Sequence, residues 1–139
     1  MASALIDASV MVAVFAPREP QAERYRDLLA LAALERWSLS TTWPCVVEAS
    51  YLVPPPQRFA LLNWIGKGGV MVFPFEQSAL LDFVPLMRRY TEKPRTEMDL
   101  ADASLLELAA QTGVTTIMSL DQRDFSRYRL PDGRAFEIL

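Results

Sequence analysis

Short runs of apolar residues alternate along the chain with longer stretches in which apolar residues recur at helical spacing. Short apolar runs bounded by turn residues predict buried strands, whereas apolar residues three or four positions apart predict helices. The pattern predicts strands at 4–6, 38–41, 70–75, 114–120 and 136–139, and helices at 8–15, 20–37, 43–52, 58–65, 77–90 and 99–111. Strands separated by helices in this order predict an α/β fold, a three-layer α/β/α domain around a mostly parallel central sheet.

Proline and glycine mark the ends of several predicted helices. Three consecutive prolines at 54–56 stop the helix that ends at residue 52, because proline cannot continue the helical hydrogen-bond ladder. Gly113 is placed to cap the helix at 99–111, since glycine adopts the left-handed conformation that often ends helices. The sequence contains no internal repeat and no low-complexity linker, so we expect one domain over residues 1–139.

Two aspartates come directly after predicted strands. Asp7 follows the strand at 4–6, and Asp121 follows the strand at 114–120. In open parallel sheets the ligand crevice lies at the carboxyl ends of the strands, so both residues are candidates for a site. Asp7 could equally be the N-cap of the next helix, and Asp121 or Asp124 could form an Asx turn or cap a short segment at 125–129. For Asp124 we favour this structural role, because it lies three residues beyond the strand end.

Glu48 has apolar neighbours on nearly every side of its predicted helix. A carboxylate in such surroundings is costly to desolvate unless it is paired or bound to a metal ion. The alternative is that Glu48 occupies the one exposed edge of the helix.

Asp99 and Asp102 begin the predicted helix at 99–111, and their separation of three residues puts them on one face. Asp99 could be an N-cap with Asp102 as its capping-box partner, which would require no chemistry. The alanine-rich turn beneath them indicates that this helix end packs closely against another element, which capping alone does not require.

One arrangement accounts for four of these acids together, two from strand ends and two from helices that flank the same crevice: Asp7, Glu48, Asp102 and Asp121. Four carboxylates within a few ångströms of one another remain ionised only in the presence of cations. Hard oxygen ligands of this kind select Mg²⁺ or Mn²⁺.

The composition excludes several kinds of catalytic and metal site. The chain has no histidine, which excludes Ser-His-Asp nucleophile systems and histidine zinc sites. Its net charge of −3 argues against nucleic-acid binding through a generally basic surface, although arginines cluster locally at 88–89 and 123–129. The single cysteine, Cys45, can form no internal disulfide, and there is no leader-like or membrane-spanning apolar run. These features predict a soluble, cytoplasmic protein.

Several of these segments, taken in order, resemble those of PIN-domain ribonucleases, specifically the VapC-like toxins of bacterial type II toxin–antitoxin pairs. The matching blocks are LIDAS at the start, VVE around residue 48, MDLADASLLELA, and IMSLDQRDF, of which the last is the most specific. The third block carries Asp99 and Asp102, and the last carries Ser119 at a position where the family usually has threonine. The three prolines at 54–56 and the segment after them match no pattern of the family.

The resemblance implies a Mg²⁺- or Mn²⁺-dependent endoribonuclease that hydrolyses RNA phosphodiester bonds. It assigns the family's acidic tetrad to Asp7, Glu48, Asp102 and Asp121, with Asp99 as a fifth acid, and leaves open whether Asp99 or Asp102 is the closer metal ligand. It further implies a homodimer and a cognate antitoxin protein whose C-terminal segment blocks the site.

Two other functions fit parts of the pattern. A receiver-like phosphoacceptor signalling domain is also α/β with acids clustered at strand ends, but it needs a lysine at the end of a late strand, and Lys67 and Lys93 both lie in predicted loops. A catalytically inactive PIN-fold binding protein is the second alternative, and the complete set of acids argues against it.

Overall fold

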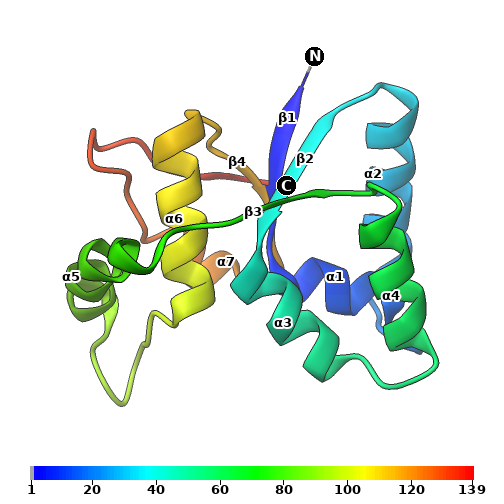
Figure 1. The fold of residues 1–139 in the computed structure, drawn as a ribbon, viewed down its shortest axis with the longest axis horizontal. Coiled ribbons are helices and arrows are strands. Elements are labelled where there is room, and N and C mark those ends of the chain that lie inside the picture. Colours follow the sequence, from blue (N-terminus) through cyan, green and yellow to red (C-terminus); the bar gives the residue numbers. More distant parts are fainter. Residues whose placement is uncertain (1) are drawn as a thin grey trace.

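A parallel five-stranded sheet forms the centre of the computed structural model, which describes residues 2–139 (Figure 1). The strands are Ser3–Ile6 (β1), Ser38–Thr42 (β2), Met71–Phe73 (β3), Thr116–Met118 (β4) and Glu137–Ile138 (β5). Their order across the sheet is β3-β2-β1-β4-β5, and every neighbouring pair is parallel. The predicted α/β fold is therefore confirmed, with a sheet that is parallel throughout.

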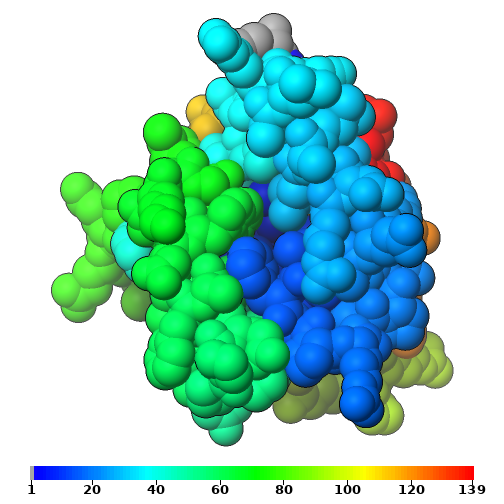
Figure 2. Space-filling view, turned by 90° about the vertical axis from the view of Figure 1, so that its right-hand side faces the viewer, coloured from blue at the N-terminus to red at the C-terminus, as the bar shows by residue number. Residues whose placement is uncertain are grey.

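Helices cover both faces of this sheet. They are Ala8–Phe15 (α1), Ala22–Leu34 (α2), Trp43–Leu52 (α3), Gln57–Gly66 (α4), Leu80–Tyr90 (α5), Leu100–Thr112 (α6) and Gln122–Phe125 (α7). In Figure 1, α1 to α4 lie on one side of the sheet and α5 and α6 lie on the other. Figure 2 shows the outside of the first layer, where the blue N-terminal residues lie between α2 and the green α4. These layers bury the central strands on both faces.

The middle strand β1 consists of residues that suit burial on both sides. Ala4, Leu5 and Ile6 are fully buried, and they pair with β2 on one edge and with β4 on the other. Strands covered by helices on both faces read as short continuous apolar runs, which is why β1 shows no alternation of polar and apolar residues.

The order of the strands creates a switch point between β1 and β4. From β1 to β2 to β3 the chain passes through α1–α4 on one side of the sheet, and from β3 it returns through α5 and α6 on the other side to pair β4 with β1. Connections that leave neighbouring strands toward opposite faces open a crevice at the carboxyl ends of those strands. The residues that follow Ile6 and Met118 therefore lie where such a crevice is expected.

The ends of the elements differ from the predictions by a few residues. The helix predicted at 20–37 spans Ala22–Leu34, and the first turn of the helix predicted at 77–90 is a 3-10 turn at Gln77–Ala79. Gly113 caps α6 with a φ of 75°, as predicted. Within residues 2–139, no helix has the length and apolar character needed to cross a membrane.

The prediction was wrong for the segment after β4. Residues 122–125 form α7, so the short segment begins three residues before the predicted 125–129, and of the two acids considered as its cap it is Asp121 that caps it. The physical reason is that the Asp121 side chain caps this short helix by accepting a hydrogen bond from the Asp124 backbone N–H at 3.1 Å. Asp124 therefore lies inside the helix and is not its cap.

Candidate functional site

A pocket of about 380 Å³ opens at the carboxyl ends of β1 and β4, where the switch point lies. Its acidic lining residues are Asp7, Glu19, Glu48, Glu97, Asp99, Asp102, Asp121 and Asp124. Among the described residues that line it, none is lysine or arginine. The structure thus brings all five predicted site acids to one concave surface, from segments more than a hundred positions apart.

Asp7 forms the floor of the pocket. Its side chain is only 6 % exposed, and its Oδ2 atom accepts hydrogen bonds from the hydroxyls of Ser9 and Ser119, both at 2.8 Å. Asp7 stands at the N-cap position of α1, yet its side chain makes no capping hydrogen bond there. Burial raises the pKa of Asp7, and the two hydroxyls oppose this shift. The Asp7 carboxylate is therefore held toward the pocket by serines.

The same two serines tie Asp7 to the loop between β4 and α7. Ser119 Oγ also accepts a hydrogen bond from the Asp121 backbone N–H at 2.9 Å, and Ser9 Oγ accepts one from the Leu120 N–H at 3.0 Å. The Asp7 backbone N–H donates to the Met118 carbonyl at 3.0 Å, which extends the pairing of β1 with β4 by one residue. These bonds fix the position of Asp121 relative to Asp7.

Asp102 reaches the pocket from the first turn of α6. Its Oδ2 atom accepts a hydrogen bond from the Tyr128 hydroxyl at 2.7 Å. Burial raises the pKa of Asp102 to about 8, with a further contribution from the negative charge of Asp99. Asp99 is the N-cap of α6 and accepts the Asp102 N–H at 2.8 Å. The helix-capping role considered for these two acids therefore applies to Asp99. The Asp102 carboxylate instead accepts a hydrogen bond from Tyr128.

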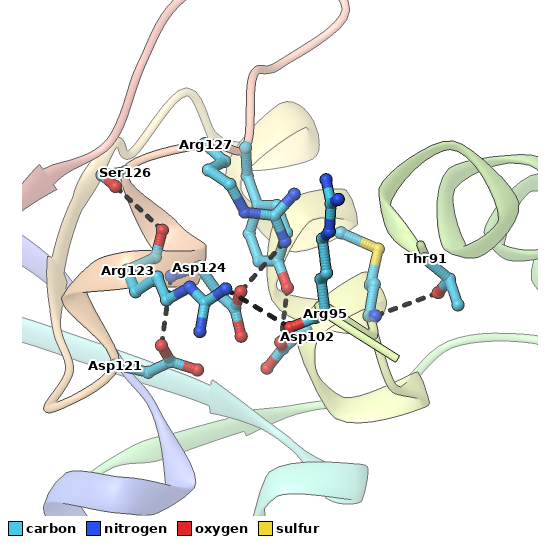
Figure 3. A network of polar contacts seen from close by, with 10 residues as sticks. Thr91, Arg95, Asp102, Asp121, Arg123, Asp124, Ser126 and Arg127 are labelled. Atoms are coloured by element: carbon cyan, nitrogen blue, oxygen red, sulfur yellow. Dashed lines mark hydrogen bonds and ion pairs between the residues drawn. The ribbon is translucent and has the colours of Figure 1, made fainter. Parts of the chain in front are cut away.

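Three carboxylates come especially close together. One oxygen each from Asp102, Asp121 and Asp124 can be chosen so that all lie within 4.8 Å of one another, and Figure 3 shows these side chains converging. Burial raises the pKa of Asp121. Asp124 also accepts a hydrogen bond from Arg127 at 2.9 Å, which offsets part of the negative charge. Close carboxylates repel one another, so this group attracts cations.

The sequence favours a structural role for Asp124, and the place of Asp124 in this group is the main feature of the pocket that the sequence analysis does not predict. A signal was present in its spacing of three residues from Asp121, which puts both acids on the same side of a helical turn. Such a spacing is informative only within a helix. The sequence pattern predicts a turn after the strand and not the short helix α7.

Glu48 extends from α3 to the rim of the pocket and is half-buried. Burial raises its pKa to about 7, and the charges of Asp99 and Asp7 contribute in the same direction. The outer edge of α3 is occupied instead by Val47, which is 64 % exposed. Glu48 therefore faces the acids and not the open solvent side of its helix.

The donor set of the pocket fits a hard divalent cation. The acidic ligand atoms are all carboxylate oxygens, their mutual repulsion is relieved by a bound cation or by protonation, and the trio within 4.8 Å is close enough to share one ion. Oxygen ligands of this type favour Mg²⁺ or Mn²⁺ over the softer transition metals. Asp7, Glu48, Asp99, Asp102, Asp121 and Asp124 are the residues that could hold such an ion.

The lysines do not support a receiver-like phosphoacceptor. Lys93 lies outside the pocket and pairs with Glu97 at 3.7 Å on the surface, and Lys67 lies at the C-terminal end of α4. Neither occupies the end of a late strand, where a receiver needs its lysine. This alternative is not favoured.

Comparison with known protein families gives one match. The family model described as the PIN domain matches residues 4–130, which covers most of the chain and includes every acid of the pocket. A comparison with curated proteins gives no match.

Proposed function

Because the chain belongs to the PIN-domain family, whose members are generally nucleases, we propose that it is a Mg²⁺- or Mn²⁺-dependent endoribonuclease. The observation that carries this proposal is the pocket in which acids from β1, α3, α6 and the β4–α7 loop converge. A binding protein that had lost its activity would have no need to keep this costly set of like charges.

In this proposal the ion is held by Asp102, Asp121 and Asp124, which offer the closest oxygens, together with Asp7. When bound, such an ion supplies Lewis acidity, which polarises a phosphoryl oxygen and lowers the pKa of water. Asp99 Oδ1 accepts the capping bond from the Asp102 N–H, so Oδ2 is the oxygen that Asp99 would offer to the ion.

Glu48 would accept the proton of the attacking water. Its carboxylate lines the pocket beside the other acids, where it can accept a proton from water. Ser9 and Ser119 keep the Asp7 carboxylate in one orientation through their hydrogen bonds, so that the site is organised before the substrate binds. Each residue then has one task in the hydrolysis.

Arginines beside the pocket supply contacts for the RNA backbone. Arg95 and Arg123 are exposed, and they lie next to the acids in Figure 3, where Arg123 donates to the Arg95 carbonyl at 3.3 Å. Guanidinium groups suit phosphate oxygens and would offset the negative charge of the pocket toward an anionic substrate.

We also propose that the protein is the toxin of a toxin–antitoxin pair and that its antitoxin covers the pocket. In this role it would act in the cytoplasm, as a single domain that forms a homodimer. The sequence blocks that resemble VapC-like toxins support this role. So do exposed apolar side chains of α3 in or beside the pocket, Trp43, Val47 and Leu52, since clustered apolar surface marks sites of protein association.

The metal dependence gives a direct test. Purified protein should cleave a single-stranded RNA in the presence of Mn²⁺ or Mg²⁺, and excess EDTA should lower the rate by roughly 100-fold or more, because the described residues that line the pocket include no lysine or arginine to stabilise the developing charge. Addition of Mn²⁺ in excess over EDTA should restore cleavage. Cleavage that continues unchanged in EDTA would rule out the metal-dependent mechanism.

A further inference from the structure

We propose that Tyr128 is a positioning residue of this site, whose buried hydroxyl holds the Asp102 carboxylate in the orientation that binds the divalent ion. The inference rests on the proposed function, because it assumes that Asp102 is a metal ligand. It adds a residue that lies outside the acidic set and twenty-six positions from Asp102.

The Tyr128 ring is fixed by its surroundings. It is fully buried, and it makes edge-to-face contacts with Tyr90 and Phe125, whose ring centroids lie 5.0 and 5.1 Å away. The Arg127 guanidinium lies 5.7 Å from the ring centroid. Because aromatic rings packed in this way cannot shift without displacing their neighbours, the hydroxyl occupies a defined place.

The hydroxyl engages one oxygen of Asp102 and leaves the other free. The distance of 2.7 Å from the Tyr128 hydroxyl to Asp102 Oδ2 is that of a strong hydrogen bond to a carboxylate. Among the hydrogen bonds of residues 2–139, none involves Asp102 Oδ1. Tyr128 thus fixes the rotation of the carboxylate and keeps Oδ1 available as a ligand.

The same bond sets the spacing between two elements that carry ligands. Tyr128 follows α7 closely, and its backbone N–H donates to the Asp124 carbonyl at 3.3 Å. Its side chain therefore connects α6, which carries Asp102, to α7, which carries Asp124 and has Asp121 as its N-cap. Without this connection, repulsion between the carboxylates would be free to turn Asp102 away from the other two.

The test compares two tyrosine-to-phenylalanine variants from the same aromatic cluster. Tyr128→Phe removes the hydroxyl and keeps the ring, and we expect Mn²⁺ affinity, measured by electron paramagnetic resonance of free Mn²⁺, to fall roughly 10-fold or more, as when other outer-shell partners of metal ligands are removed. Tyr90→Phe is the matched control, because the Tyr90 hydroxyl accepts a hydrogen bond from the Arg129 N–H at 3.1 Å and, among residues 2–139, makes none to an acid. This variant should bind Mn²⁺ as the wild type does.

Two further measurements separate positioning from a general structural role. RNA cleavage by Tyr128→Phe should approach the wild-type rate at saturating Mn²⁺ and fall below it at low Mn²⁺. In an Asp102→Asn background, Tyr128→Phe should weaken the remaining Mn²⁺ binding by less than twofold, because the residue through which it acts is already altered.

The outcomes distinguish this inference from the proposed function. Wild-type Mn²⁺ affinity in Tyr128→Phe, or an equal loss in both phenylalanine variants or in both Asp102 backgrounds, would overturn the role of Tyr128 and leave the metal site intact. If the wild type and Tyr90→Phe bind no Mn²⁺ at all, the proposed function fails, and the role of Tyr128 fails with it.

Discussion

Replacing Asp7 by asparagine should abolish RNA cleavage, with a loss of roughly 100-fold or more, while the protein remains folded. Asparagine keeps the shape of the side chain and an oxygen that accepts the hydrogen bonds of Ser9 and Ser119, but it removes the negative charge. Because Asp7 is buried among other acids, losing its charge should not lower the free energy of unfolding of the metal-free protein. Cleavage rates and urea unfolding curves of the same preparations check both statements.

The control for this variant is Asp132→Asn. Asp132 is a surface acid whose carboxylate pairs with Arg134 at 2.7 Å, and it is not one of the residues that line the pocket. It undergoes the same chemical change and should retain wild-type cleavage. Loss of cleavage in Asp7→Asn alone, in preparations made in the same way, would exclude a contaminating nuclease as the source of activity. Retained activity in Asp7→Asn would mean that the carboxylate does not take part in the reaction.

The stability of the metal-free protein should fall as the pH rises from about 4 to about 8. Burial and neighbouring charge raise the pKa of Asp102 to about 8 and that of Glu48 to about 7, against ordinary values of 3.8 and 4.5. The folded state then binds more protons than the unfolded state in this range. The stabilisation is fully present below the unfolded pKa values and is lost as the pH passes through the folded ones.

The size of this loss follows from Asp102. A tenfold change in an acid dissociation constant corresponds to about 1.4 kcal/mol. Because Asp102 is only half-buried, solvent screens its interactions, and half of the stabilisation that its raised pKa would give is about 3 kcal/mol. Urea unfolding at several pH values in EDTA measures it. Saturating Mg²⁺ should remove most of the slope, and Asp102→Asn should reduce it in EDTA. A metal-free protein whose stability rises steadily over this range would contradict the electrostatic description of the pocket.

The layered fold could be predicted because its signals are local. Short apolar runs for β1 and β4, helical spacing for α2 and α6, and the glycine at the end of α6 each determine a backbone conformation within a few residues. The alternation of strands and helices then leaves few parallel topologies. Asp7 and Asp121 could be chosen as candidates for the same reason, because a strand end is a local feature whose place in a parallel sheet is known.

The remaining features of the pocket depend on contacts that no local pattern encodes. Tyr128 reads as an ordinary aromatic residue in a turn, and only the packing of α6 against the segment after α7 brings its hydroxyl to Asp102. Ser119 is a small polar residue at a strand end, and its bond to Asp7 Oδ2 spans 112 positions. The role of Asp124 was missed because a helix of four residues leaves little periodic signal.

The most direct measurement is anomalous diffraction from crystals of the protein grown or soaked with Mn²⁺. We expect an anomalous peak inside the pocket, bound by oxygens of Asp102, Asp121 and Asp124 together with Asp7, and we expect this peak to disappear or weaken strongly in Asp7→Asn. Crystals that show Mn²⁺ only at surface acids outside the pocket, at concentrations that support RNA cleavage, would contradict this expectation.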